Sequence, residues 1–164
     1  MGRYAIGPTR GPGEKGSKRQ MIFGKKERAI CHILVVEDEP LVAFDNEYQL
    51  KDAGYEVVGT TDSAEEARRM ISEAEALDLV MADINLSDGT GIEVAEAARE
   101  RGVAVLFVTG NCPDEYRHLA IGCLSKPYSS KVLKNALDAI DTVMRAEDVK
   151  KVPEQLTIFG VEGV

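Results

Sequence analysis

The sequence predicts an α/β fold, a doubly wound five-stranded parallel sheet with helices on both faces. Five short segments rich in Val, Ile and Leu alternate along the chain with segments whose apolar residues recur at helical spacing. The strand segments are apolar almost throughout, which is typical of strands buried on both faces. Helical crossovers between such strands imply a parallel sheet, and the functional crevice of that kind of sheet lies at the carboxyl ends of its strands.

The first half of the pattern runs from residue 30 to Gly102. Its expected strands cover 30–36, 56–60 and 77–83, and its expected helices cover 40–53, 63–75 and 92–101. Pro40 suits the first turn of a helix, and the apolar spacing continues through Leu41, Phe44, Tyr48 and Leu50. Ser63 and Glu66 form a capping box for the second helix. Gly54 and Gly102 end the first and third helices, and the stretch around Asp88 predicts a loop.

The second half has a fourth strand over 103–109 and a short fifth strand over 123–125. Between them, Pro113 and Gly122 leave room only for a shortened fourth helix within 113–121. Ser129 caps a final helix, whose inner side carries apolar residues as far as Met144.

The charge divides the chain into unlike parts. The 164 residues carry a net charge of −8, although residues 1–30 hold eight Lys and Arg against two acids. We expect a disordered basic tail over 1–29, a folded domain over 30–148 and a C-terminal tail over 149–164 that is too short for an output domain. Met21 as the natural start, and a basic arm that touches a partner, both stay open. The apolar end of the C-terminal tail, LTIFGV, could dock on its own domain or on a partner.

The composition excludes several functions. An acidic body argues against DNA binding, because a phosphate backbone repels it. No apolar run approaches the roughly 18 residues of a membrane helix, and the first twenty residues lack a secretory signal, so a cytoplasmic protein is expected. Cys31, Cys112 and Cys123 lack metal spacing and are expected to be free thiols. A redox-sensitive pair of Cys112 and Cys123 is the alternative.

Polar residues follow the predicted strands at their carboxyl ends. Glu37 and Asp38 follow the first strand, Asp83 and Thr109 end the third and fourth, and Lys126 follows the fifth. Three carboxylates at one edge need counter-charge, which Lys126 and a Mg²⁺ ion would supply. With a metal bound, a carboxylate can attack phosphorus, and the cations then neutralise the phosphoryl oxygens.

These residues stand in the motifs VVEDEP, MADINLSDGTG, VTG and SKP, and residues 31–148 thereby resemble the receiver domain of bacterial response regulators. The resemblance implies the strand order 2-1-3-4-5 of the flavodoxin-like, CheY-like fold. It implies that Asp83 is the phosphoacceptor and that Thr109 and Lys126 bind the phosphoryl group. It also implies that Mg²⁺ is held by the carboxylates of Glu37, Asp38 and Asp83 and the backbone carbonyl of Asn85. In this family the peptide before the proline of SKP is often cis.

Two features depart from the family pattern. Receivers often carry Tyr or Phe three residues before the lysine, where this chain has Cys123; Tyr116 or Tyr128 could take its role. The shortened fourth helix alters the usual signalling and dimerisation face. The segment VLFVTGN resembles an atypical Phe-x-Thr-Gly subgroup, whose members are often stand-alone receivers.

The function implied is a single-domain response regulator that accepts phosphate on Asp83 from a histidine kinase or phosphotransfer protein. It would not be a conventional enzyme, although its phosphorylation and dephosphorylation would be self-catalysed. Output would pass through contacts with an unknown protein, through a phosphorylation-dependent dimer, or through action as a phosphate sink. The alternatives are a pseudo-receiver that binds partners without phosphorylation and a Mg-dependent aspartyl phosphatase. Asn85 counts against the phosphatase, because such enzymes typically have an acid at that position.

Overall fold

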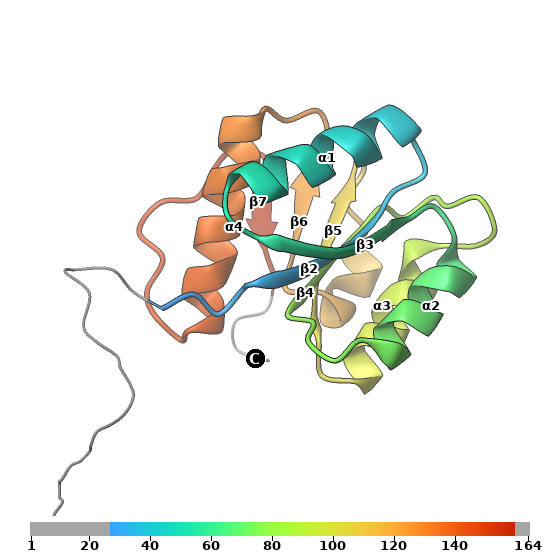
Figure 1. Ribbon diagram of the computed structural model, residues 1–164. Helices are drawn as coiled ribbons and strands as arrows, with labels where there is room; N and C mark the ends of the chain where they lie inside the picture. Colours follow the sequence, from blue (N-terminus) through green and yellow to red (C-terminus); the bar gives the residue numbers. More distant parts are fainter. Residues whose placement is uncertain (1–26, 160–164) are drawn as a thin grey trace, which may run out of the picture.

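The structure is a computed structural model that describes residues 27–159 (Figure 1). Nearly all of the predicted basic tail, including Met21, lies outside the described residues, as does the segment 160–164. The described strands are β2 (His32–Val36), β3 (Glu56–Thr61), β4 (Leu79–Ala82), β5 (Ala104–Thr109), β6 (Gly122–Ser125) and β7 (Leu156–Ile158). The described helices are α1 (Pro40–Asp52), α2 (Ala64–Glu73), α3 (Gly91–Glu100), the 3₁₀ helix η2 (Asp114–Leu119) and α4 (Ser130–Met144). None of these helices combines the length and the apolar character needed to cross a bilayer.

The strands form one sheet in the order β3-β2-β4-β5-β6-β7. The first five are mutually parallel, and their order is the predicted 2-1-3-4-5. The predicted α/β class is therefore confirmed. Each of these five strands is joined to the next through a helix, which carries the chain back to the end of the sheet where the previous strand began, as parallel pairing requires.

A sixth strand corrects the expected number of strands and the expected C-terminal boundary. Strand β7 pairs antiparallel with β6, with Cys123 opposite Thr157 and Leu124 opposite Leu156. The Phe159 amide also donates to the carbonyl of Ile121 (2.9 Å), and the Phe159 side chain is buried. The segment LTIF thus docks on its own domain, and residues 156–159 are part of the fold rather than of a tail.

Two apolar cores lie on opposite faces of the sheet. The core beneath α1 and α4 includes Ile33 and Met81 from the sheet and Leu137 from α4. The core beneath α2 and α3 includes Leu34 and Phe107 from the sheet and Ile71 from α2. Figure 1 shows the same division, with α1 and α4 on one side and α2 and α3 on the other. Neighbouring residues of one strand enter opposite cores, because successive side chains of a strand point to opposite faces.

Helix α1 leaves exposed three of the four apolar residues that predicted it. Leu41, Phe44 and Tyr48 are 84%, 73% and 61% exposed, whereas Ala43 and Leu50 are buried. The three exposed residues lie three and four positions apart, so they share one face of the helix. We call Leu41, Phe44 and Tyr48 the α1 apolar face.

The fourth helix is reduced as predicted, to the six-residue 3₁₀ helix η2. Its N-cap, Pro113, provides no side-chain hydrogen bond, and Tyr116 departs from helical geometry in its middle. Runs of 3₁₀ helix longer than three or four residues are uncommon, because their hydrogen bonds are poorly aligned. Packing of neighbouring segments must therefore hold η2 in place.

The last described residue provides a test of the sixth strand. Phe159 is 2% exposed and belongs to the core beneath α2 and α3, with the Arg117 guanidinium 5.0 Å from its ring. We expect Phe159→Ala to lower the free energy of unfolding by about 2 kcal/mol, less than a central Phe→Ala costs, because Phe159 follows the edge strand β7, where neighbouring groups can relax into the space. Urea denaturation would measure this, with the exposed Thr157→Ala as control. Equal losses in both variants would contradict the docking of this strand.

Candidate functional site

The carboxyl ends of four neighbouring strands bring the predicted site residues together. The Asp83 amide donates to the Val36 carbonyl, and the Lys126 amide donates to the Thr109 carbonyl, both at 2.9 Å. The first bond continues the pairing of β4 with β2, and the second continues the pairing of β6 with β5, each by one residue. Asp83 and Lys126 are therefore held at the carboxyl ends of their strands. Glu37 is fixed similarly by donation of its amide to the carbonyl of Thr61 (2.9 Å).

Lys126 lies between two carboxylates that come from different strands. Its Nζ is 2.9 Å from Glu37 Oε1 and 3.0 Å from Asp83 Oδ2. Glu37 and Asp83 are 3% and 8% exposed, so water screens this pair of contacts poorly. One ammonium group therefore serves two buried acids.

The pKa values reflect this imbalance of charge. Burial raises the pKa of Glu37, and the nearby Asp83 adds to the rise, while hydrogen bonds from the Glu39 amide and Lys126 oppose it. Burial alone would lower the pKa of Lys126, but its bonds to Glu37 and Asp83 outweigh burial and raise that pKa. Lys126 is therefore firmly protonated, and the site favours additional positive charge.

The other two acids of the first cluster are more exposed. Asp38 is exposed at the edge of the site. Glu39 occupies the N-cap position of α1, yet its side chain makes no capping hydrogen bond; its carboxylate lies 3.5 Å from Lys126 Nζ. Glu39 therefore contacts the lysine of the site and does not cap α1 with its side chain. The sequence could not indicate this contact, because Glu39 and Lys126 lie far apart in the chain.

Asp83 begins a loop that is packed tightly against α3. The Asn85 amide donates to Asp83 Oδ1 (3.3 Å), and the Gly91 amide donates to the Ile84 carbonyl (2.7 Å). Gly91 lies so close that a methyl group there would overlap the Asp83 carbonyl oxygen. This close approach requires glycine and fixes the start of the loop.

Asp88 lies in the predicted loop, where its side chain caps helix α2. Its carboxylate accepts hydrogen bonds from the Ser63 hydroxyl (2.8 Å) and the Ala64 amide (2.6 Å), at the first turn of α2. An acid at a helix N-terminus stabilises the free amides there. The loop after Asp83 is thereby attached to α2.

Thr109 and the two candidate tyrosines occupy different environments. Thr109 is 4% exposed, and its Oγ1 accepts a hydrogen bond from the Asn111 amide (3.5 Å). Tyr128 packs on the α1 and α4 side and donates to Asn46 Oδ1 (2.9 Å), and burial raises its pKa to about 12. Tyr116 packs in the core beneath α2 and α3. Nothing in the sequence indicated the Asn46–Tyr128 bond, because a buried Asn within α1 follows no motif.

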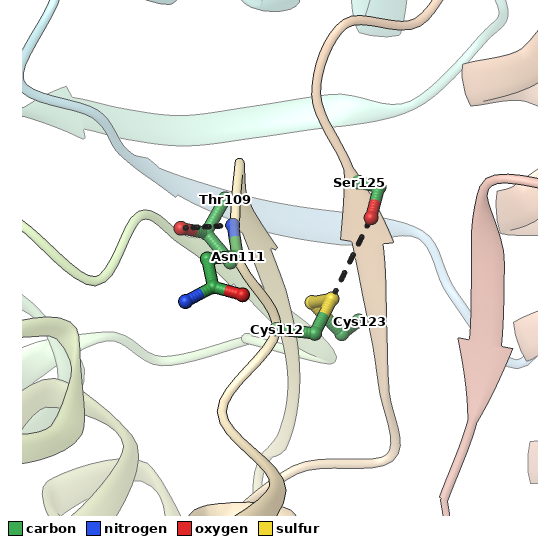
Figure 2. Close-up of a disulfide and its surroundings, with 5 residues drawn as sticks. All are labelled: Thr109, Asn111, Cys112, Cys123 and Ser125. Carbon is green, nitrogen blue, oxygen red and sulfur yellow. Dashed lines mark hydrogen bonds between the residues drawn. A yellow bond between two sulfur atoms is a disulfide. The ribbon is translucent and has the colours of Figure 1, made fainter.

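Two of the three cysteines are not free thiols, which corrects the sequence expectation. Cys112 and Cys123 form a disulfide with Cα atoms 6.0 Å apart (Figure 2). Their separation of only 11 residues and the reversal of the chain through η2 bring them together. Cys31 is free and exposed. The alternative of a Cys112–Cys123 pair, which the sequence left open, is the arrangement in the structure.

The donor chemistry suits a magnesium ion, although the acids are not gathered around one point. Glu37, Asp38 and Asp83 would offer carboxylate oxygens, which hard divalent cations prefer. Within residues 27–159, however, no three acidic, histidine or cysteine side chains stand close enough to hold a metal as they lie. Lys126 lies between two of the predicted ligands, Glu37 and Asp83. The donor set is thus present but not preassembled.

The family of the chain follows from comparison with known proteins. The model of the response regulator receiver domain matches residues 33–138, and the chain belongs to this family. Receiver domains are signalling phosphoacceptors of two-component systems rather than conventional enzymes.

Named relatives are similar over part of their length. The phyllosphere-induced regulator PhyR of Methylorubrum extorquens is 38% identical over 79 residues, which cover 47% of this chain and 30% of that protein. The regulatory protein TorR of Escherichia coli K12 is 33% identical over 126 residues, which cover 71% of this chain and 54% of that protein. The chain therefore spans only about a third to a half of these relatives.

Solved structures agree with the fold. Chemotaxis protein CheY4 of Vibrio cholerae has a TM-score of 0.61 at 27% identity, and the match covers 68% of this chain and 98% of that chain. Response regulator TrrA of Thermotoga maritima, solved in complex with Mg(2+)-BeF, has a TM-score of 0.61 at 27% identity, with 68% and 99% covered.

Proposed function

We propose that the protein is a phosphoacceptor of a two-component relay, in which Asp83 takes a phosphoryl group from a histidine kinase or a phosphotransfer protein. The observation that carries the proposal is the lysine-bridged pair of Glu37 and Asp83 at the carboxyl edge of the sheet. A buried carboxylate beside a fixed ammonium group is suited to attack phosphorus, because the charge that moves onto the phosphoryl oxygens is already balanced.

In the proposed reaction, an oxygen of the Asp83 carboxylate forms a bond to phosphorus as the bond from phosphorus to the donor's histidine nitrogen breaks. Mg²⁺, held by Glu37, Asp38, Asp83 and the Asn85 carbonyl, would neutralise phosphoryl oxygens. Lys126 stays protonated and pairs with the transferred group. The Thr109 hydroxyl, whose present bond to the Asn111 amide is long at 3.5 Å, would turn to donate to a phosphoryl oxygen.

The α1 apolar face supports a protein as the donor. Leu41, Phe44 and Tyr48 stand on the helix that begins directly after the acids, and they are too exposed to serve this domain's own core. Beside them, a hollow between α1 and the Lys126–Pro127–Tyr128 turn is lined by Leu41, Val42 and Asn46. Contiguous exposed apolar side chains mark protein contact sites. A phosphodonor protein seated here would lie beside Lys126, which contacts Asp83.

The test is phosphorylation by a small donor, which needs the site but not the docking face. With acetyl phosphate and Mg²⁺, we expect the wild type to gain the mass of one phosphoryl group and Asp83→Asn to gain none. Asp88 carries a carboxylate in the same loop and caps α2, so Asp88→Asn is the matched control and should still react. A gain that persists in Asp83→Asn would place the acceptor elsewhere. No gain in the wild type, with Mg²⁺ binding intact, would favour the non-phosphorylated binding module.

A further inference from the structure

We propose that the Cys112–Cys123 disulfide is a redox modification site that governs how readily the chain accepts phosphate at Asp83. The proposal rests on the proposed function and extends it to regulation. The bond joins the loop that follows Thr109 to strand β6, which leads to Lys126 (Figure 2). Thr109 and Lys126, which would bind the phosphoryl group, thus each lie three residues from a cysteine of the disulfide.

The register of the sheet places Cys123 on the same face as Thr109. Phe107 pairs with Cys123, and Thr109 pairs with Ser125. Alternate residues of a strand share a face, so Cys123 and Ser125 lie on the side of Phe107 and Thr109. Cys112 reaches the same place from the loop, with its Sγ 3.8 Å from Ser125 Oγ. Figure 2 shows the sulfur atoms beside Ser125 and across from Thr109.

The disulfide holds the residue on which the Thr109 hydroxyl depends. The Asn111 amide donates to Thr109 Oγ1, and Asn111 directly precedes Cys112. While Cys112 is bonded to β6, the backbone of Asn111 is held in this position beside the Thr109 side chain. Breaking the bond frees the loop start, and the hydroxyl can then turn toward Asp83. Oxidation therefore favours the unphosphorylated arrangement, and reduction shifts the population toward the receptive one.

Apart from the disulfide, most contacts of the segment closed by this bond lie beyond Pro113, including the packing of Tyr116 in the core beneath α2 and α3 and the Arg117 guanidinium on the Phe159 ring. The segment contains η2, which lacks a side-chain cap and is interrupted at Tyr116. The buried Leu119 and a hydrogen bond from Arg99 to the His118 carbonyl (2.6 Å) hold its far end, near β6. Its near end, at Cys112 and Pro113, depends on the disulfide. Reduction should thus loosen the end that adjoins Thr109.

The two sulfur atoms differ in access, which sets the order of the exchange. Cys123 is fully buried, whereas Cys112 is half-buried. A thiolate of a dithiol reductant attacks Cys112 Sγ, and Cys123 leaves as a thiolate that takes up a proton. The reductant's second thiolate then attacks the mixed disulfide and releases Cys112, so two electrons and two protons pass to the pair and the reductant becomes a disulfide. Exchange with a small disulfide such as oxidised glutathione reverses these steps.

The experiment compares phosphorylation by acetyl phosphate in the oxidised and the reduced protein. Alkylation and mass spectrometry should count one free thiol after oxidised glutathione and three after dithiothreitol. We expect the reduced form to react faster by about fivefold or more, the lower end of coupling between two sites in a protein. Under both conditions, Cys112→Ser should react as fast as the reduced wild-type protein. Cys31→Ser should respond to oxidation and reduction as the wild type does.

Two results would overturn the proposal: a count of three thiols after oxidation, or equal rates in the two forms of the wild type. If neither form takes up phosphate, the phosphoacceptor proposal fails, and thermal melting then tests whether the disulfide responds to oxidation. A melting temperature that is higher in the oxidised form, with no such difference in Cys112→Ser, would retain the disulfide as a redox-responsive site. Equal melting temperatures would reject it.

Discussion

Replacing Gly91 by Ala is expected to lower the free energy of unfolding by about 3 kcal/mol, the upper range for forcing extra atoms into a packed site. The added Cβ would overlap the Asp83 carbonyl oxygen and lie 2.9 Å from the carbonyl carbon and 3.1 Å from Ile84 Cα. All three are backbone atoms, so no side chain can rotate away. The start of α3 must shift, or the loop that begins at Asp83 must move.

The two responses can be separated by measuring stability and chemistry together. Urea denaturation reports the loss of stability, and the rate of acetyl phosphate uptake reports displacement of Asp83. Gly110→Ala is the matched control, because nothing lies within 4 Å of a Cβ at that position. If Gly91→Ala proved as stable as Gly110→Ala, the close approach of Gly91 to the Asp83 carbonyl would not be needed for the fold. We expect a slower reaction in Gly91→Ala as well, because Asp83 begins the loop that moves.

Replacing Lys126 by Met should have a comparable effect on stability, about 3 kcal/mol at neutral pH without Mg²⁺. Removing one partner of a buried ion pair leaves an uncompensated charge, and that charge costs more than the pair contributed. Here two buried carboxylates, Glu37 and Asp83, would lose the same ammonium group. The pKa of Glu37, already raised by burial, should rise further.

Mg²⁺ provides the diagnostic for this variant. If the acids form the metal site, millimolar Mg²⁺ should restore more stability to Lys126→Met than it adds to the wild type, because the ion replaces the missing charge. Denaturation with and without Mg²⁺ would measure the difference. Lys134→Met, the same change at an exposed position of α4, should respond to neither condition. Equal stabilisation of Lys126→Met and the wild type would argue against Mg²⁺ beside Glu37 and Asp83.

The sequence alone determined the order of strands and helices and the residues that meet at the sheet edge. Apolar strands and helical crossovers specify parallel pairing, and parallel strands carry their last residues to the same edge. For that reason Glu37, Asp83, Thr109 and Lys126 could be placed together although they lie far apart in the chain. Caps such as Ser63 and Ser129 were equally readable, because they act on amides three residues away.

Only the tertiary structure decided the remaining features. Strand β7 has three residues, too few for a periodic pattern, and it forms because β6 offers an unpaired edge. The exposure of the α1 apolar face could not be read from its spacing, since the same spacing also describes a buried face. The position of Lys126 between two acids and the pairing of Cys112 with Cys123 depend on distances across the sheet and around η2. Those distances exist only once the chain has folded.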